Sequence, residues 1–191
     1  GLGYYNRARN LKKAAIQIVQ EYHGQLPKDV KELKKLSGIG SYTAGAIASI
    51  AYNQVAPVVD GNVLRVVSRV LASIADISLP KTKKQMEEDL LQVIPTDRPG
   101  TYNQALMELG AMICVPNGKP HCTECPLNTL CLAYLEECTD SIPYKAPKKK
   151  RKVEKKTILV IEYKDEVVLN KRPSKGLLAG MYEFPNLEGH K

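Results

Sequence analysis

Four of the five cysteines lie close together in the sequence, and this cluster restricts the possible fold more than any other feature. They are Cys114, Cys122, Cys125 and Cys131, with gaps of seven, two and five residues. Thiolates at such short spacing converge on one soft metal centre. A helical protein of this size without a secretory signal has no need of disulfides, and a Cys₄ zinc site usually shows two Cys-x₂-Cys pairs where this chain has one. We therefore interpret the cluster as the ligands of an iron–sulfur centre, and Cys138 as a structural thiol.

The positive charge of the chain is concentrated in one short segment. The sequence has 28 Lys and Arg against 20 Asp and Glu, a formal charge of +8, and residues 145–156 hold eight basic residues and one acid. With Pro143 and Pro147 beside it, this run is predicted to be solvated, and we interpret residues 141–156 as an interdomain linker. The alternatives are a polyanion contact and a targeting signal. Residues 147–153 resemble a nuclear import signal, a match that we attribute to chance.

The sequence pattern changes at this linker. Residues 1–140 show the apolar spacing of helices, with one stripe at Leu11, Ala15, Ile18 and Tyr22 and another at Val63, Val66, Val67, Val70, Leu71 and Ile74. Gly24 is placed to end the first helix, and Thr82 with Gln85 and Thr101 with Gln104 fit capping boxes at helix starts. Residues 157–163 and 167–171 are β-rich and predict a hairpin. The unit of residues 157–191 is too short to close a core, and no apolar run reaches the roughly 18 residues that span a bilayer.

Two neighbouring segments of the helical part carry candidate functional residues. Residues 36–45 read Leu-Ser-Gly-Ile-Gly-Ser-Tyr-Thr-Ala-Gly, in which Gly38 and Gly40 allow a tight hairpin between two helices. Bare backbone N–H groups in such a hairpin can hold a phosphate without reading sequence. About twenty residues later, residues 57–62 read Pro-Val-Val-Asp-Gly-Asn and place Asp60 near a helix start. Asp60 taken alone is better explained as an ordinary helix cap or Asx-turn carboxylate.

Taken together, these segments resemble a known family. The hairpin, the run Pro-Val-Val-Asp-Gly-Asn-Val-x-Arg-Val and the four cysteines are similar to the helix–hairpin–helix DNA glycosylases with an iron–sulfur cluster, and within them to the adenine DNA glycosylases. The opening residues 1–10 and the late residues 176–185 fit as well, the latter resembling the start of a Nudix-like domain. The resemblance implies a mainly α fold with a cluster loop over residues 1–140, the linker, and an incomplete Nudix-like domain over residues 157–191. It implies base excision repair by hydrolysis of adenine mispaired with 8-oxoguanine or guanine in duplex DNA, after the base is flipped.

The resemblance also implies roles for individual residues. Asp60 would stabilise positive charge on the sugar or attack it, Asn62 would position Asp60, and Tyr42 stands where related lyases carry a Schiff-base Lys. Tyr4 would wedge into the duplex. The hairpin contacts with DNA would come from Gly38, Ile39, Gly40 and Ser41. The carbonyls of Lys34, Leu36 and Ile39 would bind a monovalent cation, and the cluster would be of the 4Fe–4S type.

The resemblance leaves three alternatives open: an endonuclease III-like lyase, a non-catalytic DNA-binding module and a Cys₄ zinc protein. The chain departs from the family in its first cysteine gap, which is seven residues where six is usual. The family's proton-donating Glu falls upstream of Gly1, so the chain is expected to be an inactive fragment without the N-terminal part and most of the C-terminal domain. A monomer in the cytoplasm, associated with the nucleoid, is expected.

Overall fold

The computed structural model describes residue 4 and residues 6–147 and 153–189. The chain forms two compact units, Gly1–Ala146 and Pro147–Lys191, and the boundary falls within the predicted linker segment. The import-signal-like run lies outside the described residues except for its two ends. Within the described residues, no helix has the length and apolar character to cross a membrane.

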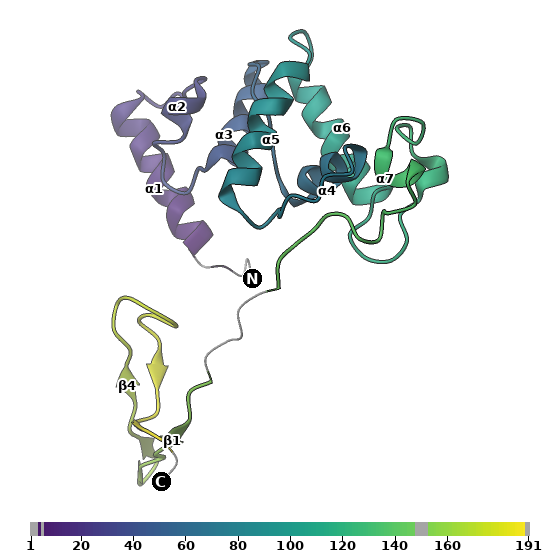
Figure 1. Ribbon diagram of the computed structural model, residues 1–191. Helices are drawn as coiled ribbons and strands as arrows, with labels where there is room; N and C mark the ends of the chain where they lie inside the picture. The colour runs from purple at the N-terminus through teal and green to yellow at the C-terminus, as the bar shows by residue number, and fades with distance from the viewer. Residues whose placement is uncertain (1–3, 5, 148–152, 190–191) are drawn as a thin grey trace. The chain divides into compact units, whose positions relative to one another are not determined.

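The first unit is helical (Figure 1). Its elements are α1 (Asn6–Glu21), α2 (Val30–Leu33), α3 (Ser41–Ala46), the π-helical turn η1 (Ile47–Ala51), α4 (Gly61–Val70), α5 (Pro80–Val93), α6 (Pro99–Met112), the 3₁₀ turn η2 (Cys122–Glu124) and α7 (Leu132–Leu135). The hairpin predicted from the two glycines is the connection between α2 and α3. The four clustered cysteines lie between the end of α6 and the start of α7, and Cys138 follows α7.

Two groups of buried apolar side chains hold this unit together. The first joins α1, α2 and α3 through Ala14, Leu33, Leu36, Ala44, Ala48 and Ala56. The second joins α4 and α5 through Val59, Val63, Leu64, Met86 and Leu90, and Tyr102, Leu106 and Met107 of α6 pack against it. The small side chains of the first group let its helices approach closely. The segment before α4 lies between the two groups in sequence, and its Val58 and Val59 are almost fully buried. The start of α4 is therefore anchored on its N-terminal side.

Most helix boundaries follow from local signals, with three differences. Gly24 ends the first helix as predicted: its φ is +79°, and its N–H donates to Ile18 O at 2.9 Å. Both predicted capping boxes are wrong, because α5 and α6 begin earlier, each with a proline in its first turn and no side-chain cap. The second apolar stripe ends with α4 at Val70, and Ile74 beyond it is 82% exposed. Leu11 is also exposed, at 72%, so the first stripe is narrower than predicted.

The second unit is built from short antiparallel strands. Its pairs are β1 (Lys156–Ile158) with β6 (Asn186–Glu188), β2 (Glu162–Tyr163) with β3 (Glu166–Val167), and β4 (Asn170–Lys171) with β5 (Tyr182–Glu183). The predicted hairpin corresponds to β2 and β3, with Tyr163 opposite Glu166. The run of residues 157–163 is divided between two strands rather than continuous. Across residues 153–189 no side chain is buried, so this unit has no core of its own.

Candidate active site and cysteine-lined cavity

Asp60 is the residue immediately before α4, and both of its carboxylate oxygens accept a hydrogen bond. Oδ1 accepts from the N–H of Val63 at 2.8 Å, which caps the helix, and Oδ2 accepts from Nδ2 of Asn62 at 3.2 Å. A carboxylate at a helix N-terminus is also favoured by the helix dipole. Two oxygens that each accept one bond still have lone pairs free for a further partner. The helix-cap interpretation of Asp60 is therefore correct, and it leaves the carboxylate available for chemistry.

Asn62 is held in one orientation by Arg65. The guanidinium Nη2 donates to Asn62 Oδ1 at 2.9 Å and to Gly110 O at 2.6 Å, and Nε donates to Cys114 O at 2.7 Å. Arg65 is 7% exposed. Burial lowers the pKa of its guanidinium, while the nearby Cys114 and Asp60 act in the opposite direction. Arg65 thus places a positive charge where the last carbonyls of α6 need donors, and it fixes the amide that supports Asp60.

Gly110 allows this arrangement by its lack of a side chain. A Cβ atom at position 110 would lie 2.6 Å from Cβ of Asn62. The axes of α4 and α6 can therefore approach closely at the point where Asn62 faces α6. Figure 1 shows α4 lying against α6 in the helical unit.

The segment that leads to Asp60 is fixed by a buried asparagine of α6. Asn103 Nδ2 donates to Ala56 O at 2.8 Å and to Ser49 Oγ at 2.9 Å, and its Oδ1 accepts from the N–H of Val58 at 3.2 Å. Asn103 is 1% exposed, so these bonds form away from water and keep their strength. One side chain thereby satisfies the backbone of an extended segment that has no helix or sheet partner.

Tyr42 and Asn62 approach the same face of α6. The Tyr42 hydroxyl lies 3.7 Å from Sδ of Met107, and Met107 is three residues before Gly110, where Asn62 packs. Residues three apart on a helix share a face, so the predicted catalytic residues Asp60, Asn62 and Tyr42 are brought to one region from α3 and α4. Tyr42 is 40% exposed, so part of its side chain is open to solvent.

The hairpin forms a tight turn at the surface next to α3. Gly38 has φ +79°, and the N–H of Ile39 donates to Leu36 O at 3.1 Å. Of the carbonyls predicted to bind a cation, those of Lys34, Leu36 and Ile39, the Leu36 carbonyl thus already accepts one hydrogen bond. Gly40 is the N-cap of α3 and Ser41 its first residue, and no side chain caps this helix. Tyr4 lies two residues before the start of α1, and its side chain is 85% exposed.

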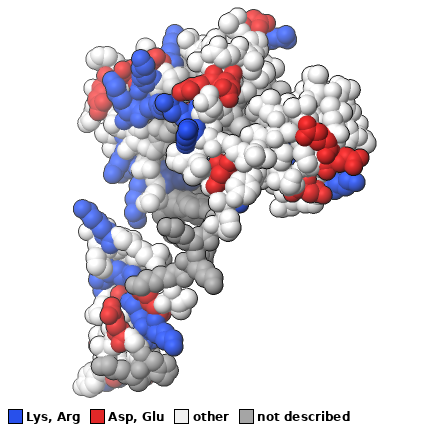
Figure 2. All heavy atoms as spheres, in the orientation of Figure 1, with Lys and Arg blue, Asp and Glu red and all other residues white. Residues whose placement is uncertain are grey.

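Exposed basic side chains are frequent on α1, on α2 and on the segment that connects them. Figure 2 shows Lys and Arg gathered over the part of the helical unit that carries α1 and α2, and acidic side chains over the part that carries α7. The exposed basic residues of α1, α2 and their connection are Arg7, Arg9, Lys12, Lys13, Lys28, Lys31, Lys34 and Lys35. Such a surface attracts a polyanion to the side of the molecule that bears the hairpin.

The four clustered cysteines line one cavity. Its walls also include Arg69 and Val66 of α4, Leu109 and Ile113 at the end of α6, and Tyr134 of α7. Arg69 Nη1 donates to Sγ of Cys114 at 3.2 Å, and its Nε donates to Ile142 O at 2.8 Å. Burial raises the pKa of the Cys122 and Cys131 thiols, and at Cys122 the charges of the other three cysteines raise it further. Four thiolates facing one cavity are a soft donor set that suits a positively charged centre.

The four thiols lie on the wall of this cavity. Across the part of the chain that the structure describes, no three His, Cys, Asp or Glu side chains are grouped so as to hold one metal ion. A mononuclear zinc site needs four sulfurs that converge at about 2.3 Å from one ion. Cys138 does not line the cavity.

Sequence reasoning missed Arg65, Arg69, Asn103 and Gly110. The partners of these four residues lie roughly 45 to 73 positions away in the chain. The only local signal was the Arg of the Asp-Gly-Asn-Val-x-Arg-Val run, three residues after Asn62 and therefore on the same face of α4.

Comparisons with known proteins give relatives over nearly the whole chain. Residues 1–96 match the family described as HhH-GPD superfamily base excision DNA repair protein. The chain is similar to the adenine DNA glycosylase of Arabidopsis thaliana, with 42% identity over 98% of this chain and 32% of the relative. It is also similar to the adenine DNA glycosylases of Mus musculus, at 38% identity, and Homo sapiens, at 36%, again over 98% of this chain. It covers 45% of the Mus musculus relative and 42% of the Homo sapiens relative. The chain thus spans about a third to a half of the length of these three relatives.

Solved structures show the same helical architecture. A thermostable thymine-DNA glycosylase aligns with a TM-score of 0.62 and 32% identity, over 71% of this chain and 62% of that one. A non-covalent endonuclease III–DNA complex aligns with a TM-score of 0.59 and 29% identity, over 70% of this chain and 60% of that one.

Proposed function

The chain belongs to the HhH-GPD superfamily of base excision DNA repair proteins, and from this premise we propose that it acts as a DNA glycosylase that removes adenine from duplex DNA. The observation that carries the proposal is the carboxylate of Asp60 at the start of α4, which accepts hydrogen bonds from Val63 and Asn62. The same helical unit bears a basic surface over α1 and α2 (Figure 2). The similarity to adenine DNA glycosylases supports adenine as the base.

The chemistry suits this carboxylate. Cleavage of the bond between adenine and its sugar builds positive charge on the sugar, and a fixed carboxylate beside it stabilises that charge or attacks C1′. Asn62, oriented by Arg65, would keep the carboxylate in place as charge develops. The base must leave the stack first, and contacts of the hairpin and the basic surface with the phosphate backbone would hold the duplex during flipping.

We propose adenine opposite 8-oxoguanine, or opposite guanine, as the substrate. The test is single-turnover base release from matched duplexes that differ in one pair, using the protein as its gene encodes it. Adenine should be released from pairs with 8-oxoguanine and guanine, and thymine opposite guanine should be retained. Because the thymine-DNA glycosylase shares this fold, release of thymine instead would overturn the assignment of the base.

Tyr42 argues for a glycosylase without lyase activity. A lyase of this kind needs an amine that attacks the sugar, and a phenol cannot form a Schiff base. Borohydride should therefore trap no covalent adduct between the wild-type protein and DNA, whereas Tyr42→Lys should give a trapped adduct. Tyr144→Lys is the control, since Tyr144 is similarly exposed (47%) and lies outside the proposed site. Strong trapping by the wild type would show that another amine attacks, and would favour the lyase alternative.

We propose that Cys114, Cys122, Cys125 and Cys131 bind a 4Fe–4S cluster. The four thiols line one cavity, and a cluster distributes its thiolate ligands over several irons. When bound, it would fix the loop between α6 and α7, and we assign it no step of the hydrolysis.

We further propose that Tyr4 enters the duplex and that the hairpin carbonyls bind a monovalent cation. The exposure of Tyr4 and the free lone pairs of the carbonyls are compatible with these roles.

A further inference from the structure

One N–H group in the turn of the hairpin donates a hydrogen bond to a side chain of another helix. Residues 36–39 form a turn closed by the bond from Ile39 N–H to Leu36 O, with Gly38 at φ +79° in the third position. These are the features of a type II turn. The N–H of Ser37, in the second position, takes no part in the closing bond and needs an acceptor elsewhere.

Gln17 of α1 supplies that acceptor. Its Oε1 accepts the N–H of Ser37 at 2.8 Å, across twenty residues of sequence, and both residues are half-buried. Seven residues earlier on the same face of α1, Asn10 packs against Gly38 so closely that an added Cβ would lie 2.6 Å from Asn10 Cβ. The turn therefore contacts α1 at two points: Gly38 packs against Asn10, and Ser37 donates a hydrogen bond to Gln17.

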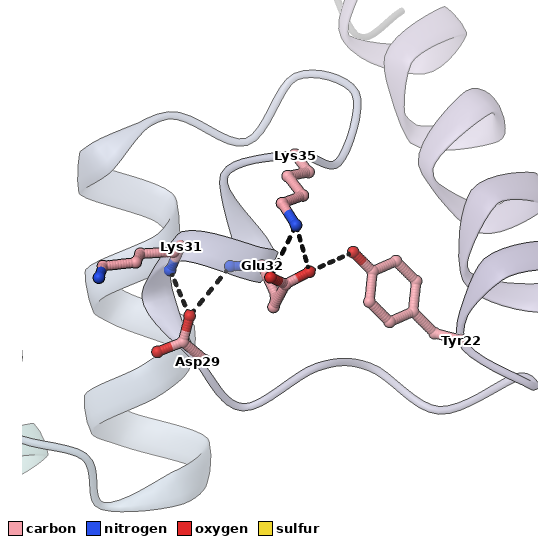
Figure 3. A network of polar contacts seen from close by, with 5 residues as sticks. All are labelled: Tyr22, Asp29, Lys31, Glu32 and Lys35. Carbon is pink, nitrogen blue, oxygen red and sulfur yellow. Dashed lines mark hydrogen bonds and ion pairs between the residues drawn. The ribbon is translucent and has the colours of Figure 1, made fainter.

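The helix before the turn is attached to α1 separately. Figure 3 shows Glu32 of α2 between the hydroxyl of Tyr22, which donates to it at 3.0 Å, and the ammonium of Lys35, which donates at 2.7 Å. Asp29 caps the same short helix through the N–H groups of Lys31 and Glu32. Hydrogen bonds from Lys35 and then Tyr22 lower the pKa of Glu32. These contacts fix the start of the hairpin, and Gln17 fixes its tip.

Three other N–H groups of the hairpin have no acceptor within the part of the chain that the structure describes. In the described residues, no hydrogen bond is formed by the N–H of Gly38, Gly40 or Ser41, whereas those of Ser37 and Ile39 are used internally. We propose that Gln17 is a positioning residue for DNA binding: by engaging Ser37 N–H, it holds the turn so that the three free N–H groups meet one DNA phosphate. This inference rests on the proposed function, since it deepens the role of the hairpin in binding duplex DNA.

Gln17→Met tests the proposal, because methionine keeps the length and the apolar stem but removes the acceptor. The amide hydrogen of Ser37 should exchange faster with solvent, as followed by NMR. Affinity for a short unmodified duplex should fall roughly fivefold, as for the loss of one hydrogen bond. Gln20→Met is the matched control, an exposed glutamine on the same helix, and should change neither quantity.

The effect of Gln17→Met is then measured again in a protein that already carries Ser37→Pro. Proline fits the second position of a type II turn and has no N–H, so Gln17 has nothing to accept there. Adding Gln17→Met to Ser37→Pro should then leave DNA affinity unchanged. Equal losses of affinity in both backgrounds would show that Gln17 acts by packing and would overturn the proposal. Unchanged exchange at Ser37 in Gln17→Met would also overturn it. If the wild type fails to bind duplex, the proposed function falls, while the exchange comparison still decides whether Gln17 holds the turn.

Discussion

Replacing Asp60 by Asn is expected to slow adenine release by roughly 10²- to 10³-fold, the range found when one electrostatic stabiliser of a transition state is removed. The substitution keeps the shape and removes the negative charge that would face the sugar. Single-turnover release from a duplex with adenine opposite 8-oxoguanine measures the effect, on the protein as its gene encodes it. Binding to a duplex with a non-cleavable adenine analogue should be unchanged, because the hairpin and the basic surface are not altered.

The same variant should cost some stability, for a reason visible in the hydrogen bonds. Asp60 accepts hydrogen bonds from both Val63 N–H and Asn62 Nδ2. The bond from Arg65 to Asn62 Oδ1 prevents the Asn62 amide from flipping and so keeps Nδ2 directed at position 60. An asparagine at position 60 has one acceptor oxygen, so it can satisfy only one of these donors. The free energy of unfolding should fall by about 1 kcal/mol.

The control is Asp76→Asn, a carboxylate that accepts the N–H of Ser78 at 2.8 Å in a loop away from the site. That variant should release adenine at the wild-type rate. Full activity of Asp60→Asn would reduce Asp60 to a helix cap and would favour the DNA-binding module.

Cys125→Ser is expected to abolish the bound iron, whereas Cys138→Ser should retain it. A serine hydroxyl does not ionise as a thiol does and is a poor substitute for a thiolate ligand. Cys138 does not line the cavity, and the hydrogen bonds at that residue run through its backbone, so its sulfur is dispensable. The wild-type protein, purified without oxygen, should be brown and should be bleached by dithionite.

Iron and acid-labile sulfide are the direct measurements for all three proteins. A colourless wild-type protein with one equivalent of zinc would establish the zinc alternative. Iron retained in Cys125→Ser at the wild-type level would mean that the ligand set is different.

The parts of the molecule that sequence could predict are those determined locally. The turn at Gly38 and the helix end at Gly24 follow from residues that tolerate positive φ, and both are present. The Asp60 cap follows from its place before an apolar helical stripe. The capping boxes at Thr82 and Thr101 failed because prolines two residues earlier start α5 and α6, and a proline at that position is as strong a local signal.

The support around the site could not be predicted, since it depends on distant pairs. Arg65 contacts backbone atoms 45 and 49 residues away, and Asn103 contacts Ser49 and Ala56 across a similar separation. No spacing rule links such residues in a single sequence. The bond from Ser37 to Gln17 also joins residues that are distant in sequence. A glutamine on a helix is usually exposed, so the sequence predicts a solvated side chain at position 17.

The contact between Gly110 and Asn62 has a consequence for how a conservative substitution at position 110 should be judged. Gly110→Ala looks harmless, because alanine is the better helix former and the change adds one methyl group. That methyl group would nevertheless meet Asn62 at 2.6 Å, and Asn62 is the residue that supports the Asp60 carboxylate. Because the Cα and C atoms of Asn62 would also lie only 3.2 and 3.3 Å from the new carbon, α4 and α6 must separate at this point, and the substitution is expected to disturb both the packing of the helices and the support of Asp60.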